Sequence, residues 1–348
     1  MGTYVGLDVS LKETSVCILR DDGSVVFEGK VATDPAVLAR LLRKRAPDLI
    51  RVGLESGPTS AWLTHALAAE GVPVVCLDAR HAQAVLSVRP NKSDPGDARG
   101  LAEMVRAGWY RAVQVKSMTA HERKALLIAR HQLVGMRVQM DNQVRGILKT
   151  FGLVIGACGR GQIGQRARAL AKGRPEVDAV VSAMVVSAMV VVRDSLVQQI
   201  AAFDRIIRRL ANGDDTSRRL MSVPGVGPVV ALAFKCTIDD PQRFARARDV
   251  GAYLGLTPKR YQSGELDLSG RISKCGDGFM RTCLYEAAGV LLTKVQRWSP
   301  LKAWGVRLMK RVGAKKAKVA VARKLAIILF RIWKDGTEFH WAKEATMG

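Results

Sequence analysis

The chain lacks several features that would assign it to common classes of protein. It has no apolar run long and uncharged enough to span a membrane. Its first residues, MGTYVGLDVS, begin directly with a strand pattern and lack the charged-then-apolar layout of a secretory signal. Its six cysteines are scattered, without a CxxC pair or a zinc-type spacing. We therefore expect a cytoplasmic protein with reduced thiols and no membrane partner.

Acidic residues are scarce, and their scarcity is uneven along the chain. The 348 residues include 55 Lys and Arg against 31 Asp and Glu, a formal net charge of +24. Residues 1–113 hold 14 basic and 13 acidic side chains, whereas residues 241–348 hold 22 and 8. Neutralising phosphates releases counterions, so this excess indicates a polyanionic partner. The pattern predicts a near-neutral catalytic module joined to modules that grip nucleic acid.

The near-neutral segment carries the pattern of an α/β domain. Apolar alternation and turn residues predict strands at 4–9, 15–20, 24–31, 49–54 and 72–77. Helical spacing predicts helices at 35–46, 59–70 and 81–86. A hairpin meander followed by alternating helices and strands favours an RNase H-like fold over a doubly wound nucleotide-binding sheet.

The remainder of the chain is expected to be mainly helical. Residues 119–150 predict a long helix or helical hairpin, and the Gly- and Arg-rich residues 156–175 predict a loop. Helices are also expected at 243–254 and 278–296, with a loop or hairpin at 256–274. The repeated pentapeptide SAMVV at 182–191 is too short for a structural repeat and reads as a small insertion. We therefore divide the chain into residues 1–113, a helical linker at 114–212, and a C-terminal domain at 213–348.

Two C-terminal segments suggest contact with phosphates. The segment SVPGVGPVV at 222–230 fits either the hairpin of a helix-hairpin-helix element or ordinary helix punctuation. Between Gly305 and Lys334 there are ten basic residues and no acidic one, with aromatic residues interspersed. Such a helical tail fits a phosphate backbone better than it fits a merely solvated face.

Four carboxylates are the strongest candidates for chemistry. Asp8 lies in the first strand, Glu55 ends the fourth, and Asp94 and Asp97 begin a helix in the segment NKSDPGDARGLAEM. The last two lie three residues apart and share a helix face, although Asp94 also fits an ordinary capped helix start. Hard oxygen ligands of this kind suit Mg²⁺, which assists phosphoryl transfer. The sequence therefore predicts one divalent-metal site made of these four residues.

Several segments together resemble a known family, the DEDD insertion-sequence transposases ("IS-one-ten" family). The N-terminal segments are YVGLDVS, LESGPTSAWLTHALAAEGVPV and RPNKSDPGDARGLAEM. The C-terminal segments are SVPGVGPVVALAF, FARARDVGAYLGLTPKRYQSGE and GRISKCGDGFMRTCLYEAAGVLL. The resemblance implies a RuvC-like (RNase H-like) DEDD domain, a coiled-coil middle and a small, mainly helical transposase domain.

The resemblance also implies a mechanism and its partners. A noncoding bridge RNA would pair with target and donor DNA, and homodimers would pair into a tetramer in the bacterial cytosol. Asp8, Glu55, Asp94 and Asp97 would hold the metal, while Ser263, in YQSGE, would attack a DNA phosphate to form a phosphoserine link.

From its residues alone, the Ser263-Gly264 pair is typical of a turn, and Ser269 and Ser273 lie close by in the sequence. The basic residues expected to contact nucleic acid are Lys259, Arg260, Arg271, Lys274, Lys310, Arg311, Lys315, Lys316 and Lys318.

Two other functions remain open on the sequence. A RuvC-type nuclease or junction resolvase would use the same carboxylates with water as the nucleophile, so Ser263→Ala would leave cleavage intact. A non-enzymatic basic scaffold would lose nothing but stability on Asp8→Ala or Ser263→Ala. The four carboxylates argue against the scaffold.

Overall fold

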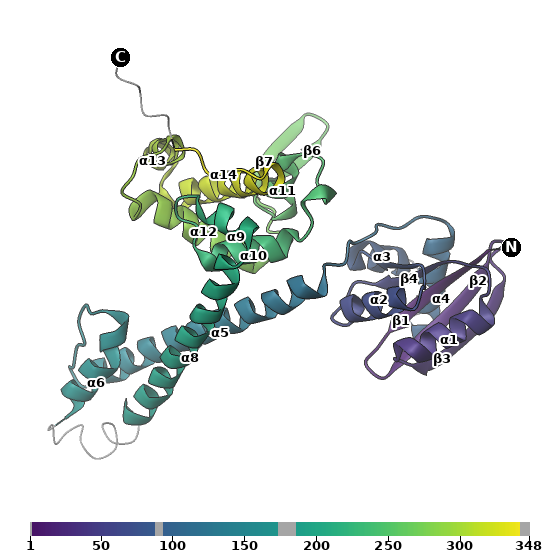
Figure 1. The fold of residues 1–348 in the computed structure, drawn as a ribbon, viewed down its shortest axis with the longest axis horizontal. Helices are drawn as coiled ribbons and strands as arrows, with labels where there is room; N and C mark the ends of the chain where they lie inside the picture. The colour runs from purple at the N-terminus through teal and green to yellow at the C-terminus, as the bar shows by residue number, and fades with distance from the viewer. Residues whose placement is uncertain (1, 88–92, 173–185, 342–348) are drawn as a thin grey trace. The chain divides into compact units, whose positions relative to one another are not determined.

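The computed structural model describes residues 2–87, 93–172 and 186–341 (Figure 1). The chain divides into two compact units, Met1–Met118 and Thr119–Gly348. The first boundary lies close to the predicted one at residue 113. The predicted boundary at residue 212 falls within the second unit and stays a prediction.

The first unit is built on a five-stranded mixed sheet. Its strands are β1 (Thr3–Val9), β2 (Glu13–Arg20), β3 (Val25–Ala32), β4 (Leu49–Glu55) and β5 (Val74–Leu77). They lie in the order β3-β2-β1-β4-β5; β1 to β3 form an antiparallel meander, and β4 and β5 run parallel to β1. This is the RNase H-like arrangement that the sequence predicts, so the RuvC-like fold class is confirmed.

Helices cover both faces of this sheet because its strands alternate between two apolar sides. Helices α1 (Pro35–Arg45) and α2 (Ser60–Ala69) pack on the face that carries Val5 and Leu7. Helix α4 (Asp94–Arg106) packs on the opposite face, and α3 (Ala79–Leu86) packs against α4. Strands whose two faces are both buried read as nearly continuous apolar runs, as β1 and β2 do.

A pair of glycines lets α4 lie directly on the sheet. Gly6 of β1 and Gly53 of β4 are register partners. A Cβ atom at Gly6 would lie 2.0 Å from the carbonyl oxygen of Ala98, and one at Gly53 would lie 2.3 Å from a methyl carbon of Val105. Any side chain at these two positions would push α4 away from the strands, so the glycines set the distance between helix and sheet.

The second unit begins with two long helices joined by a small helical tip. Helix α5 (Met118–Thr150) runs to the tip, which contains the 3₁₀ turn η1 (Arg160–Gln162) and α6 (Ile163–Ala171), and α8 (Ser187–Asn212) returns (Figure 1). The loop predicted at 156–175 is therefore wrong over residues 160–171. Ile163 and Ala167 are buried one helical turn apart, and this spacing drives the helix. The second SAMVV copy begins α8, whereas residues 182–185 of the first copy lie outside the described residues.

A buried ion network joins the two long helices. The Arg193 side chain is 2% exposed and donates from Nε to Asp141 at 2.9 Å. Arg137 donates to the other Asp141 oxygen at 3.0 Å, and Arg193 also reaches Asp194 at 2.8 Å. Burial alone would raise the pKa of Asp194, but hydrogen bonds from Arg193 and Arg168 outweigh it and lower that pKa. Buried charges tolerate few alternative partners, so the network fixes the register of α5 against α8.

The rest of the second unit is a helical core with a β-hairpin. Its helices are α9 (Asp215–Met221), α10 (Pro228–Ile238), α11 (Ala247–Tyr253), α12 (Gly278–Thr293), α13 (Pro300–Val312) and α14 (Ala314–Asp335). Strands β6 (Pro258–Ser263) and β7 (Leu266–Ile272) form the hairpin. The helix predicted at 243–254 is wrong over residues 243–246. There Asp240 caps a short 3₁₀ turn, η3 (Pro241–Arg243), and Phe244 is extended, so α11 begins only at Ala247. No helix in the described part of the chain is long and apolar enough to cross a membrane.

Candidate active site

Asp8 and Glu55 occupy equivalent places on two adjacent parallel strands. Leu7 and Leu54 are the last residues that pair β1 with β4, and each carboxylate follows directly. Because side chains alternate along a strand, Asp8 and Glu55 share a face with Gly6 and Gly53, which is the face beneath α4. Both side chains are half-buried. Two carboxylates of different strands thus lie side by side at one edge of the covered face.

The other two predicted carboxylates lie in the first turn of α4. Ser93 caps this helix, its hydroxyl accepting a hydrogen bond from the amide of Gly96 at 3.3 Å. Asp97 is half-buried and directly precedes Ala98, the residue that touches Gly6, whereas the Asp94 side chain is 63% exposed. Acidic residues suit a helix start, where the helix dipole is positive. Asp94 can therefore belong to an ordinary capped helix start and also be a candidate metal ligand.

Lys30 is a member of this site that sequence reasoning missed. Its Nζ lies 2.8 Å from an Asp94 oxygen. Register pairs Lys30 with Ser15 and Ser15 with Asp8, so Lys30 and Asp8 occupy one row across the sheet and face the same side. The hydrogen bond to Asp94 and its charge, together with Glu13 and Asp8, raise the pKa of the Lys30 ammonium. Lys30 reads as an ordinary strand residue in the sequence, because only the strand pairing puts it beside the carboxylates.

The carboxylates do not form a closed ligand set as their side chains stand. Among residues 2–87, 93–172 and 186–341, no three His, Cys, Asp or Glu side chains come close enough together to hold a metal ion. Asp94 instead points to the Lys30 ammonium. The donor types nevertheless suit a hard divalent cation, since carboxylate oxygens are the ligands that Mg²⁺ prefers. The carboxylates around Lys30 also stabilise its positive charge, so a cation is favoured beside Asp94.

Ser263 lies at the tip of the β6–β7 hairpin. It pairs with Leu266 across the two-residue turn Gly264-Glu265. Gly264 has φ of +55°, while Glu265 is not among the non-glycine residues with positive φ in the described chain, which fits a type II′ turn. The serine is exposed, as is every other residue of β6. The turn suggested by the Ser-Gly pair therefore exists and presents the serine to the outside.

The two faces of this hairpin differ in chemistry. Tyr261 pairs with Leu268 and lies on the same face as Ser263 and Leu266. The apolar side chains of this face, Tyr261, Leu266 and Leu268, are 57–63% exposed. The opposite face is polar and carries Ser269, so the two serines point to opposite sides. Ser273 lies at the base of the hairpin, half-buried, and its hydroxyl accepts a hydrogen bond from the amide of Cys275.

The predicted nucleic-acid contacts of the hairpin are not equivalent. Lys259, Arg271 and Lys274 are exposed. Arg260 is exposed too, but its Nε and Nη2 donate to the two Asp267 oxygens, both at 2.7 Å. This hydrogen bond lowers the pKa of Asp267. Arg260 must therefore leave Asp267 before its full fork can bind a phosphate.

The basic tail is two helices rather than one. Gly313, with φ of +82°, separates α13 from α14. Of the tail residues expected to contact nucleic acid, Lys318 is half-buried, with its Nζ 5.5 Å from the centre of the Tyr285 ring. The exposed ones are Lys310, Arg311, Lys315 and Lys316. The segment at 222–230 forms the turn between α9 and α10 and the first residues of α10. Gly225 in this turn has φ of +88° and packs against the α12 backbone at Ala287, and these two features account for the glycine.

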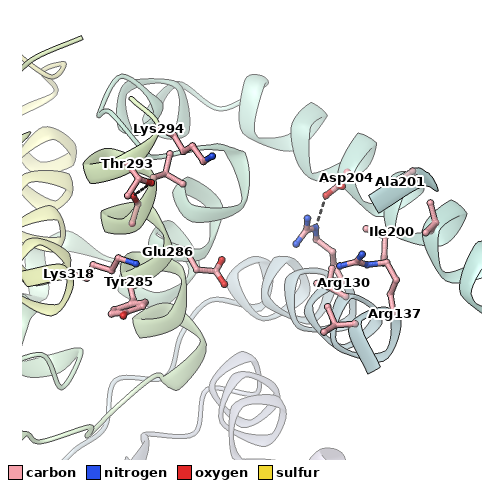
Figure 2. Close-up of a pocket in the computed structure, with 16 residues that line it drawn as sticks. Arg130, Arg137, Ile200, Ala201, Asp204, Tyr285, Glu286, Thr293, Lys294 and Lys318 are labelled. Atoms are coloured by element: carbon pink, nitrogen blue, oxygen red, sulfur yellow. Dashed lines mark hydrogen bonds and ion pairs between the residues drawn. The ribbon is translucent and has the colours of Figure 1, made fainter. Parts of the chain in front are cut away.

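A pocket of about 810 Å³ lies between the long helices and the helical core of the second unit (Figure 2). Arg130, Arg137, Lys294 and Lys318 contribute positive charge to it. Arg130 is already paired with Asp204 at 2.6 Å, and Arg137 with Asp141, so much of this charge is neutralised internally. The pocket is a structural crevice rather than a candidate active site.

Comparison with known proteins agrees with these features. Residues 5–152 match the DEDD domain of IS110, described as "Transposase", and residues 217–302 match the "Transposase IS116/IS110/IS902 family". The transposase for insertion sequence element IS1111A of Coxiella burnetii is 26% identical over 333 residues, covering 94% of this chain and 88% of the relative. A putative transposase, y4pF/y4sB, of Sinorhizobium fredii is 31% identical over 272 residues, covering 74% and 66%.

The chain also matches a further transposase and a solved structure. A probable family 20 transposase of Pseudomonas aeruginosa is 29% identical, covering 70% of this chain and 73% of the relative. The Thermus thermophilus RuvC structure aligns with 32% of this chain and 99% of its own, with a TM-score of 0.25 and 14% identity. The two family matches include all four carboxylates in the first and Ser263 in the second. The chain therefore belongs to the IS116/IS110/IS902 family of transposases, enzymes that act on DNA.

Proposed function

We propose that this transposase cuts and rejoins DNA through a phosphoserine intermediate on Ser263, assisted by Mg²⁺ at Asp8, Glu55, Asp94 and Asp97. The observation that carries the proposal is the register of β1 and β4, which sets Asp8 beside Glu55 under the acidic start of α4. Divalent ions held there would activate the attacking group and stabilise the leaving oxygen.

The exposure of Ser263 supports its role as the nucleophile. Its Oγ would form a bond to phosphorus while the bond from phosphorus to one sugar oxygen breaks. The serine proton would end on the released sugar hydroxyl, and attack by the hydroxyl of another strand would reverse the step. A serine hydroxyl needs activation for this reaction, because it is a weak nucleophile at neutral pH. Ser263 is a better candidate for the nucleophile than Ser273, because Ser273 is half-buried. Ser269 is exposed but lies on the other face of the hairpin.

The decisive test is the capture of a covalent adduct. We would express the tagged protein with the DNA that flanks its gene, purify it under denaturing conditions and sequence any attached DNA. The wild type is expected to carry DNA, and Ser263→Ala to carry none. Ser269→Ala is the matched control, since it removes a hydroxyl from the same exposed hairpin and should keep the adduct.

The alternatives predict different outcomes. If cut DNA ends appear with no attached protein in both wild type and Ser263→Ala, the enzyme is a water-using nuclease of RuvC type. If Ser269→Ala loses the adduct and Ser263→Ala keeps it, the nucleophile is Ser269. Asp8→Asn should abolish both adduct and cleavage under either mechanism, because both depend on the carboxylates.

We also propose that a noncoding bridge RNA guides the reaction and that homodimers pair into a tetramer in the bacterial cytosol. The net charge of +24 supports a large nucleic-acid partner. Exposed apolar residues on α5 and α8 support association of these helices with another copy; they are Ile128, Met136, Val138, Val191, Val192 and Ile206. Sequencing of RNA that copurifies with the protein and mass measurement before and after ribonuclease treatment test both points.

A further inference from the structure

Trp304 of α13 forms a wall shared by two hollows on the second unit. The indole is 37% exposed. One hollow, of about 410 Å³, lies between Trp304, α14 and the base of the β6–β7 hairpin. The other, of about 260 Å³, is lined by Trp304 together with Arg307, Leu308 and Arg311. An exposed tryptophan between two hollows presents both an apolar surface and a ring face to a ligand.

The larger hollow has an apolar floor and a basic rim. Pro258 and Ile272, which are register partners at the base of the hairpin, form one wall. Val319, Ala320 and Ile327 of α14 form the floor. Leu256 and three cations complete the lining, and the cations are Lys316, Arg323 and Lys324. Neither this hollow nor its neighbour is lined by an acidic residue.

We propose that this site captures one unpaired base of a DNA strand. The base would enter the apolar hollow and stack on Trp304, while the adjacent phosphates would contact Arg307 and Arg311 in the neighbouring hollow. Stacking on an aromatic ring next to a basic track is the general mode of single-strand binding. Five cations around one indole, with no acid, match a ligand that combines a flat apolar ring with an anion on either side.

The position of the site favours DNA at the point of strand exchange, and this part rests on the proposed function. Ser263 lies five residues along β6 from Pro258, about 17 Å away along the strand. That distance corresponds to a few nucleotides of a single strand. The lining offers cations and apolar groups but no side-chain carboxylate or amide to recognise a ribose 2′-hydroxyl. The site would therefore hold a displaced strand close to the serine.

Equilibrium binding tests the site without any strand cleavage. We would measure fluorescence anisotropy of a labelled oligothymidine, of a duplex of equal length and of an oligouridine, all with Ser263→Ala protein. Trp304→Ala is expected to weaken oligothymidine binding about 5- to 100-fold, the range for loss of one stacked base, and to leave duplex binding within about twofold. Trp304→Phe should retain most of the affinity.

Two further variants separate the site from general effects. Trp298→Ala removes a more exposed indole, 61% exposed, that lines neither hollow, and should leave every affinity unchanged. Ala320→Phe fills the larger hollow without removing Trp304, and should weaken oligothymidine binding as Trp304→Ala does. This second variant keeps the test valid if Trp304→Ala unfolds the protein.

Several results would overturn the proposal. Unchanged oligothymidine binding in both Trp304→Ala and Ala320→Phe would exclude the site. Equal losses for single strand and duplex would identify a general phosphate surface instead. Tighter, Trp304-dependent binding of oligouridine would assign the site to RNA. Because binding is measured without Ser263, a failed adduct test leaves the base-binding site standing, and a failed binding test leaves the serine mechanism standing.

Discussion

The ammonium of Lys30 lies 2.8 Å from a carboxylate oxygen of Asp94, on the face of the sheet where Asp8 also lies. One acidic residue of the proposed metal site is thus paired with an internal cation. Both side chains are substantially exposed, 46% and 63%, so the pair is weak and can open when a stronger cation arrives. At the proposed metal site, Lys30 would therefore compete with a divalent cation for Asp94.

Removal of this lysine should strengthen metal binding. Lys30→Met is expected to lower the dissociation constant for Mn²⁺, used as a probe for Mg²⁺, about two- to fivefold at low salt, the worth of an exposed ion pair. Titration calorimetry measures the effect directly. Lys44→Met, which changes an exposed lysine near the end of α1, should leave the constant unchanged. Weaker binding by Lys30→Met would mean that Lys30 instead positions Asp94 for the metal.

The close approach of α4 to the sheet makes Gly6 sensitive to any side chain. In Gly6→Ala the new Cβ would clash with backbone atoms of Ala98 and Ala102, at 2.0 and 2.4 Å, so the helix itself must move. We expect destabilisation of about 1–3 kcal/mol, typical of an overpacked core, with loss of hydrogen-exchange protection in β1 and α4 and weaker Mn²⁺ binding. Gly57→Ala, whose Cβ would have nothing within 4 Å, should change none of these.

The sequence was sufficient to predict the sheet of the first unit because its strands and turns have strong local patterns. The turn at Asp22 and Gly23 illustrates this, since the Asp22 side chain accepts from Ser24 at 2.8 Å and Gly23 has φ of +84°. The row that joins Asp8, Ser15 and Lys30 could not be predicted in this way. It depends on the register of three strands, which no local pattern encodes.

The predicted helix boundaries in the second unit were wrong for similar physical reasons. Residues 156–175 are rich in Gly and Arg and predict a loop, but the tertiary partners of Ile163 and Ala167 override that local preference. In the segment 243–254, Phe244 leaves the helical pattern because its ring packs against Phe330 and Tyr253, at 5.7 and 5.3 Å between ring centres. Packing against distant residues decided both cases.

Asp214 should make the second unit sensitive to acid. It caps α9, accepting from the Ser217 amide at 2.8 Å, and it pairs with Lys235 of α10. Burial alone would raise the pKa of Asp214, but hydrogen bonds from Lys235 and Ser217 outweigh it and lower that pKa. A carboxyl group with a lowered pKa stabilises the fold above its unfolded-state pKa, about 3.9, and this contribution is lost as pH falls through the folded value.

The variant Asp214→Asn isolates this charge, because asparagine is also a good helix cap. We expect it to lower the free energy of unfolding by about 1.5–3 kcal/mol at pH 7, the range for a charge-assisted hydrogen bond. The difference from wild type should shrink as pH falls below about 4, as followed by urea unfolding at several pH values. Asp215→Asn, at an exposed neighbour, should change stability little. A difference that stays constant with pH would assign the effect to packing rather than charge.

The bidentate pair of Arg260 and Asp267 should restrain DNA binding by the Ser263 hairpin. In Asp267→Ala the guanidinium loses both of its 2.7 Å partners and becomes available to a phosphate. We expect tighter duplex binding and a slope of log affinity against log salt that is steeper by about 1, as for one additional phosphate contact. Glu265→Ala removes the same charge at the hairpin turn, without releasing Arg260, and should leave the slope nearly unchanged. The double variant Arg260→Ala/Asp267→Ala should return the slope to the wild-type value. If Glu265→Ala and Asp267→Ala steepen it equally, the effect is general charge, and Arg260 is a structural residue of the hairpin rather than a phosphate contact.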